Sequence, residues 1–225
     1  MTPPNVQRVR WQQACRIVPT RYPAISLYDR VADHADFDAL YALEAMSNER
    51  LRDAVGEIER VPAHERLFGP GSGPIMAAFT HVNVLGSRFS DGSYGVFYAA
   101  QERATAVAET RYHQARFLLA TKEAAMHLPM RLYAVAIDAR LHDLRPEGAV
   151  RKEVYDADDY SAARTLGARW RGLGSAGVVY RSVRRLGGHC VGLFSPRGAR
   201  DCHHAAYLLY AWDGVRFTDV YEKMD

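Results

Sequence analysis

Three side chains whose chemistry suits a nucleotide substrate follow one another within a short stretch of this chain. Arg88 lies in a turn bounded by glycines, Tyr98 in an apolar run typical of a strand, and Glu109 in an alanine-rich run typical of a helix. An arginine binds a phosphate bidentately. A tyrosine offers a flat face for stacking, and a glutamate can hold a ribose hydroxyl or stabilise a developing positive charge. Together these residues suit a pyridine dinucleotide whose bond between ribose and nicotinamide is broken.

The elements that must position these residues are predicted from the local pattern of apolar and turn-forming residues. Residues 68–74 form turns throughout. The predicted strands are 75–82, 95–100, 130–138, 177–183, 190–194, 207–212 and 215–220, and the predicted helices are 102–119 and 156–170. Asp213-Gly214, between the last two strands, is a strong hairpin signal. Strands and helices are interspersed, which predicts an α+β fold.

The first part of the chain differs from the rest, and we predict an extended and helical N-terminal segment over residues 1–70 and a domain over 71–225. Prolines interrupt an extended stretch at 15–31, and a helical pattern follows at 36–55. The apolar residues available on that helix are Phe37, Leu40, Tyr41 and Leu43. This stripe either packs on the core or holds a protein partner.

Composition excludes some classes of function. The chain has 225 residues, a hydrophobic share of 48% and a net charge of +3, with no long basic run, so nucleic-acid binding is not indicated. Its three cysteines are widely spaced, which favours a reducing compartment, and we expect a cytoplasmic protein. No apolar run approaches the ~20 residues of a membrane span. The N-terminus has no signal-peptide pattern.

The order of the three residues resembles the RES domain, a family named for an arginine, a glutamate and a serine and found in bacterial toxin–antitoxin toxins. In that domain a glycine–arginine–aromatic turn, a strand with tyrosine and an alanine-rich helix with glutamate follow one another, as Arg88, Tyr98 and Glu109 do here. The serine best matches Ser182, after a glycine-rich lead-in at 172–177. Many members carry an asparagine shortly afterwards, and it has no clear counterpart in this chain.

The resemblance implies an ADP-ribosyltransferase-like fold, with a split, curved β core, and a toxin of a type II toxin–antitoxin system. It implies a transferase of the glycosyltransferase kind that consumes NAD as its substrate, without a metal. Arg88 would grip the diphosphate, and Tyr98 would stack beside the nicotinamide. Glu109 and Tyr98 would be the catalytic residues, with Glu109 steadying the charge on the ribose, and Ser182 would help to bind the cofactor. ADP-ribose would then pass to a protein acceptor, to water or to phosphate. The implied partner is a cognate antitoxin, of the helix-turn-helix type.

Some of these residues also fit plainer interpretations. Tyr98 fits a core aromatic. His81 stands where the family commonly has an arginine; related ADP-ribosyltransferases use a histidine there to bind a ribose, and a core histidine fits equally well. An alternative match for that arginine, Tyr28-Asp29-Arg30, lies too far upstream unless the intervening helices are an insertion.

Two other classes of function fit the sequence less well. One is a non-enzymatic nucleotide-binding module with the same pocket, and the intact set of Arg88, Tyr98 and Glu109 argues against it. The other is a DNA-binding regulator, for which the helical segment 36–55 lacks a basic recognition face. Cys202-His203-His204 is expected in an ordinary loop, because no fourth metal ligand has a recognisable spacing. No GxGxxG or P-loop opens a predicted helix, and no GxSxG motif is present.

Overall fold

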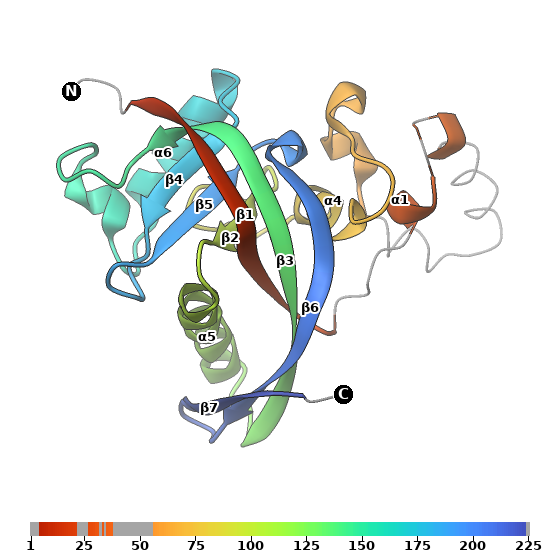
Figure 1. Ribbon diagram of the computed structural model, residues 1–225. Helices are drawn as coiled ribbons and strands as arrows, with labels where there is room; N and C mark the ends of the chain where they lie inside the picture. The colour runs from red at the N-terminus through yellow and green to blue at the C-terminus, as the bar shows by residue number, and fades with distance from the viewer. Residues whose placement is uncertain (1–4, 22–26, 32, 34, 38–55, 224–225) are drawn as a thin grey trace.

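One long strand, β3 (Met126–Asp143), is the centre of the sheet in the computed structural model of the chain. The structure describes residues 5–21, 27–31, 33, 35–37 and 56–223. One edge of β3 pairs antiparallel with β1 (Val6–Pro19). Its other edge pairs antiparallel with β6 (Ala199–Trp212) and, near its end, parallel with β4 (Gly177–Arg181). Figure 1 shows β1, β3 and β6 as long curved strands that run side by side.

The remaining strands close part of this sheet into a ring. They are β2 (Phe97–Ala100), β5 (His189–Leu193) and β7 (Phe217–Glu222). The order is β1-β2-β5-β4-β3-β6-β7, and β1 also pairs with β3, so the first five strands of that order form a ring from which β6 and β7 extend. The sheet thus takes strands from both segments that the sequence divides at residue 70, and that division stays a prediction.

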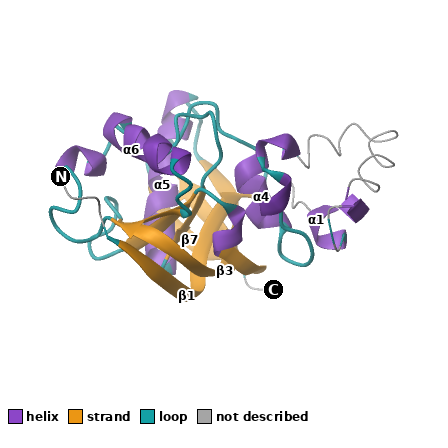
Figure 2. Cartoon of the chain, turned by 90° about the horizontal axis from the view of Figure 1, so that it is seen from above, coloured by secondary structure: helices purple, strands orange, loops and turns teal. Residues whose placement is uncertain are grey.

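Both faces of the sheet are buried, because β3 alternates between two apolar cores. Met130 and Leu132 belong to the core covered by the helices α5 (Arg103–Ala120) and α6 (Ser161–Gly172). Val135 and Ile137, of the opposite parity, belong to the core that includes residues of α4 (Gly73–Thr80) and α1 (Leu27–Arg30). Figure 2 shows α5 and α6 to one side of the strands and α4 and α1 to the other. Successive side chains of a strand point to opposite faces, which produces this alternation.

Most predicted elements after residue 95 are confirmed, which establishes a mixed α+β fold. The predicted helix 102–119 is α5, and the hairpin at Asp213-Gly214 joins β6 to β7. Helix α6 begins at Ser161, later than predicted, because Asp156 and Asp159 hold a loop by accepting backbone N–H groups. The 3-10 helices are Ile58–Arg60, Ala63–Glu65, Lys152–Tyr155 and Pro196–Gly198.

The predicted strand 75–82 is wrong, because residues 73–80 form the helix α4. Its buried residues Ile75, Met76 and Phe79 fit one face of a helix, and a short apolar run cannot be assigned to strand or helix by periodicity alone. Pro74 stands in its first turn, where the missing N–H costs nothing. The Asp29 carboxylate accepts the N–H of Gly73 at 2.9 Å, a long-range cap that no local pattern reveals.

The predicted helix 36–55 lies mostly outside the described residues, and so do Leu40, Tyr41 and Leu43. Phe37 is described: its ring is 1% exposed and stacks on Tyr28 at a centroid distance of 5.0 Å. This aromatic therefore packs on the core. Cys202-His203-His204 lies within β6 and not in a loop. Across the described residues no helix is long and apolar enough to cross a membrane.

Candidate functional site

The turn that carries Arg88 is fixed by contacts from α6. Arg164 donates from Nε to the carbonyl of Ser87 at 3.0 Å. Gly167, one turn further along α6, packs so closely that an added Cβ would lie 2.2 Å from the carbonyl oxygen of Phe89. Gly86 begins the turn with a φ of +78°, a conformation that other residues rarely adopt. The backbone position of Arg88 is therefore set by a helix that follows it by some 70 residues in sequence.

The Arg88 side chain points into the protein and is only 7% exposed. Its Nη1 donates to the carbonyls of Val154 at 3.2 Å and Asp156 at 2.9 Å, and its guanidinium lies over the Tyr160 ring at 4.3 Å. Its Nη2 is buried without a hydrogen-bond partner. The guanidinium is thus partly committed to holding the 154–160 segment, and it retains one unsatisfied donor.

Tyr98 supports the Arg88 turn through its hydroxyl. The phenol oxygen accepts the N–H of Phe89 at 2.9 Å and is hydrogen-bonded to Oγ of Ser87 at 2.8 Å. Burial raises the pKa of Tyr98 to about 12, so the phenol stays neutral. Arg16, on β1, donates to the Tyr98 carbonyl at 3.0 Å and so ties β2 to the neighbouring strand. The contacts of Tyr98 are those of a positioning residue; stacking on a nicotinamide ring stays a prediction.

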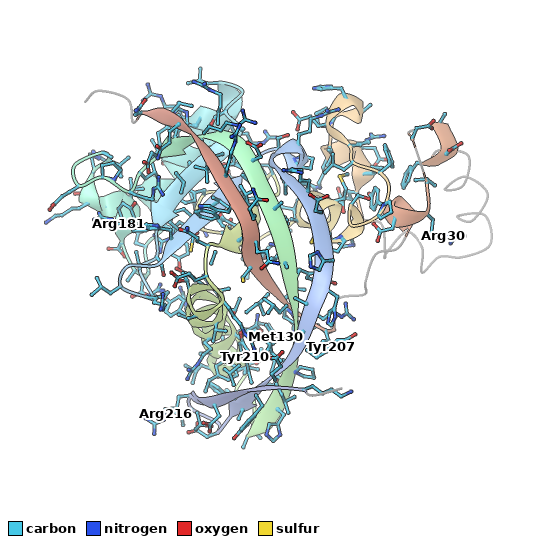
Figure 3. The ribbon with its side chains drawn as sticks, in the orientation of Figure 1. Arg30, Met130, Arg181, Tyr207, Tyr210 and Arg216 are labelled. Carbon is cyan, nitrogen blue, oxygen red and sulfur yellow. The ribbon has the colours of Figure 1, made fainter. Side chains whose placement is uncertain are left out.

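Glu109 and Ser182 meet although they lie on different elements. The Ser182 hydroxyl donates to Oε1 of Glu109 at 2.6 Å, from the turn after β4 to the middle of α5. The same oxygen of Ser182 accepts the N–H groups of Arg184 and Arg185, both at 3.0 Å, which directs its proton to the carboxylate. Oε2 of Glu109 has no hydrogen-bond partner among the described residues. Figure 3 marks Arg181, the residue directly before Ser182, at the left of the molecule.

Arg88 and Glu109 share a neighbour, the buried Tyr180 of β4. Burial is the main reason that the pKa of Tyr180 lies well above its usual value; the charge of Glu109 raises it further and that of Arg88 opposes the rise. The Phe89 ring, next to Arg88 in sequence, packs edge-on against Tyr180 at 5.1 Å. The structure therefore groups Arg88, Glu109 and Ser182 around the end of β4.

Sequence reasoning missed Arg184, which joins this group. Its guanidinium lies 3.2 Å from the centre of the Tyr112 ring, and its Nη2 lies 3.4 Å from the Tyr160 hydroxyl. Nη2 also donates to the carbonyl of Ala157. An arginine two positions after Ser182 is the only sequence signal for it, and arginines are too common in this chain for that signal to decide.

His81 lies apart from the contacts just described. Helix α4 ends at Thr80, so His81 is the residue that follows a helix and not, as predicted, part of a strand. Its Nδ1 is 3.1 Å from Oγ1 of Thr80, and its ring lies where a side chain on Gly56 would be. Its role as a ribose ligand stays a prediction.

A cavity of about 200 Å³ opens elsewhere on the molecule, against β1, β3 and β6. Arg10 and Asp138 line it, and these side chains pair with each other at 3.7 Å. The third charged residue of the lining, Arg200, pairs with Asp201 at 3.1 Å, so each charged side chain of the lining already has an ion-pair partner. None of the lining residues is one of the buried groups that lack a partner. We therefore place the candidate site around Glu109 and not in this cavity.

The group around Glu109 has the chemistry of a site for a substrate that carries phosphates and develops positive charge as it reacts. It offers an oriented carboxylate with one oxygen without a partner, and two arginines, Arg88 and Arg184, that form no ion pair within the described part of the chain. A carboxylate stabilises positive charge as it develops, and guanidiniums bind phosphates. No group of three or more potential metal ligands occurs among the described residues.

Residues 59–213 match the RES domain, and the chain belongs to this family. The chain is 27% identical over 212 residues, 92% of its length and 85% of the relative's, to the uncharacterized protein y4oC of Sinorhizobium fredii (strain NBRC 101917 / NGR234). A solved structure, that of the M. tuberculosis MbcT–MbcA toxin–antitoxin complex, is similar with a TM-score of 0.49 and 13% identity, over 97% of this chain and 86% of that one. A likeness at that level does not extend to activity or partners.

Proposed function

We propose that this chain cleaves the bond between nicotinamide and ribose in NAD and transfers the ADP-ribose to a protein acceptor, to water or to phosphate. The observation that carries this proposal is the hydrogen bond of 2.6 Å from Ser182 to Glu109. It unites the glutamate and the serine of the family motif in one contact. It also holds a carboxylate in a fixed orientation while leaving its second oxygen without a partner.

The proposed chemistry needs a charge stabiliser more than it needs a base. As the bond from C1′ of the ribose to the ring nitrogen breaks, the electron pair moves to nicotinamide, which leaves neutral, and positive charge develops on the ribose. The Glu109 carboxylate, bound to a ribose hydroxyl through Oε2, would lower the energy of that charged state. The acceptor then forms a bond to C1′ and releases its proton.

Arg88 is the residue we propose for the diphosphate of NAD, with Tyr98 behind it. Its Nη2 is the available donor, since Nη1 already binds two carbonyls. Tyr98 holds the turn from which Arg88 projects, and its ring would also border the nicotinamide. Ser182 would act through Glu109, and His81 is proposed for the adenosine ribose.

The proposed biological role is that of a toxin in the cytoplasm, held inactive by a cognate antitoxin of the helix-turn-helix type. Membership of the RES family supports the toxin part of this role. The physical expectation is that a segment of the antitoxin covers the group around Glu109.

The direct test is to incubate the purified chain with NAD and to separate the products by chromatography. We expect free nicotinamide, together with ADP-ribose, its phosphorylated form or labelled protein, depending on the acceptor supplied. No nicotinamide with water, phosphate or cell lysate as acceptor would contradict the proposal.

A non-enzymatic nucleotide-binding module is the second candidate. Binding of NAD by calorimetry without release of nicotinamide would select it.

A further inference from the structure

Two guanidinium groups from distant parts of the chain are held beside the same tyrosine. Arg88 lies over the Tyr160 ring at 4.3 Å, and Nη2 of Arg184 lies 3.4 Å from the Tyr160 hydroxyl. The two also bind consecutive backbone carbonyls: Arg88 donates to that of Asp156 and Arg184 to that of Ala157. Neighbouring carbonyls of one loop therefore bring the two positive charges together.

Each of these guanidiniums keeps a buried donor that has no partner among the described residues. The atoms are Nη2 of Arg88 and Nε of Arg184. Within the described part of the chain, no carboxylate forms an ion pair with either side chain. Asp156, whose backbone carbonyl binds Arg88, directs its carboxylate to the N–H groups of Asp158 and Asp159 at 2.8 Å. Buried charges without a counter-charge, and buried donors without acceptors, are costly unless a ligand satisfies them.

The surroundings support a net positive field at this place. His113, one helical turn after Glu109 on α5, has its pKa lowered to about 4, first by burial and then by the charges of Arg184, Arg88 and Arg116. The imidazole is therefore neutral near neutral pH. The arginines thus meet no cationic histidine, and neither forms an ion pair with a carboxylate among the described residues.

We propose that Arg184 is a second phosphate-binding residue, which together with Arg88 binds the diphosphate of a dinucleotide. This inference rests on the proposed function. It adds Arg184 to the proposed site and predicts that the site prefers two linked phosphates to one. Two guanidiniums fixed on adjacent carbonyls match a diphosphate, because each carries a positive charge and a free donor for one phosphate.

The geometry also couples this pair to catalysis. Arg184 stands in the turn whose N–H groups are bound by the Ser182 hydroxyl, and that hydroxyl holds Glu109. A diphosphate that binds Arg184 therefore fixes the turn that orients the carboxylate. Both free donors are buried, so the side chain of Arg184 or Tyr160 must move before a phosphate can bind them. Such changes of side-chain rotamer on binding are common.

The experiment measures binding by calorimetry to the full chain and to Arg184→Gln, Arg184→Lys and Arg185→Gln. The probes are ADP-ribose, inorganic pyrophosphate and inorganic orthophosphate. Arg185 is the matched control, since it lies in the same turn, pairs with Glu102 at 2.6 Å and is not part of the proposed site.

We expect Arg184→Gln to weaken binding of ADP-ribose and pyrophosphate by about 10- to 100-fold, the usual effect of losing a hydrogen bond to a charged group. Arg184→Lys should fall between the wild type and Arg184→Gln, because lysine keeps the charge without the fork. Arg185→Gln should bind as the wild type does. Orthophosphate should bind more weakly than pyrophosphate to the wild type.

Four results would overturn the inference: no binding of ADP-ribose or pyrophosphate to the wild type, equal affinity in wild type and Arg184→Gln, an equal loss in Arg185→Gln, or no preference for pyrophosphate. If Arg184→Gln melts early, Arg184→Lys gives the same comparison in a folded chain.

Nicotinamide release from NAD is scored separately. Binding lost in Arg184→Gln without release in the wild type supports the inference and contradicts the proposed function. Release that Arg184→Gln leaves unchanged overturns the inference alone.

Discussion

The Ser182 hydroxyl donates a hydrogen bond of 2.6 Å to Oε1 of Glu109, although 73 positions separate the two residues. Two backbone N–H groups, from Arg184 and Arg185, bind the same hydroxyl oxygen at 3.0 Å. The orientation of the carboxylate on α5 therefore depends on the turn that follows β4. Ser182 is accordingly a positioning residue in the proposed reaction.

Ser182→Ala should lower turnover of NAD by about 10- to 100-fold, because a hydrogen bond to a charged group is lost and the carboxylate is no longer held in one orientation. The Michaelis constant should change little, since Ser182 acts on the glutamate and not on the substrate. Ser182→Thr, which keeps the hydroxyl, should recover most of the activity. Steady-state kinetics on the three proteins measures this, and an alanine variant as active as the threonine variant would contradict it.

Glu109→Gln should reduce nicotinamide release by at least about 10²-fold, as removal of other electrostatic stabilisers does. The amide keeps the size of the side chain and can still accept from Ser182, so the fold should survive. Thermal melting checks the fold, and chromatography of the products measures the loss. Glu102→Gln, at the start of the same helix, is the control and should stay active. Turnover near that of the wild type in Glu109→Gln would place the essential acid elsewhere.

Arg88→Ala should weaken NAD binding more than Arg88→Lys, because lysine keeps the positive charge but not the bidentate fork. Calorimetry on a Glu109→Gln background, where NAD is not consumed, separates binding from turnover. The alanine variant should also be less stable, since Nη1 of Arg88 holds the carbonyls of Val154 and Asp156. Equal affinity for NAD with arginine, alanine and lysine at position 88 would leave Arg88 with a structural role only.

Gly167→Ala should destabilise the protein by about 1–3 kcal/mol, because the new methyl group would collide with the turn that carries Arg88. An added Cβ would lie 2.2 Å from the Phe89 carbonyl oxygen, whereas one at Gly172, in the same helix, meets nothing within 4 Å. Gly172→Ala is thus the matched control, expected to be neutral or stabilising by up to about 1 kcal/mol. Urea denaturation gives both values, and equal effects of the two substitutions would show that α6 does not fix the turn.

Expression of the chain alone should arrest growth of the host, and expression with the adjacent gene should relieve the arrest. The reason is the proposed consumption of NAD, or modification of a protein, by an unrestrained toxin. A tightly controlled promoter, with Glu109→Gln as the inactive control, provides the test. Normal growth while the wild-type protein accumulates to the level of that control would refute the prediction.

The α+β class and most elements after residue 95 were predictable because their patterns are local. Helix α5 has its apolar residues at helical spacing, and Asp213-Gly214 closes a hairpin between residues that pair directly. The order Arg88, Tyr98, Glu109 was readable for the same reason, since each residue lies on its own turn, strand or helix. Helix α4 was not, because a short apolar run fits either element and its cap, Asp29, comes from more than 40 positions away.

The sequence alone thus determined which chemical groups the chain contains and which local element carries each of them. The tertiary structure decided which groups meet: β1 with β3, Ser182 with Glu109, and Arg184 with the loop that also holds Arg88. Local periodicity reflects the backbone geometry of a single element. Contacts between elements depend on how the whole sheet closes and how α5 and α6 pack on it. That packing results from many weak interactions across the chain, which no short motif reveals.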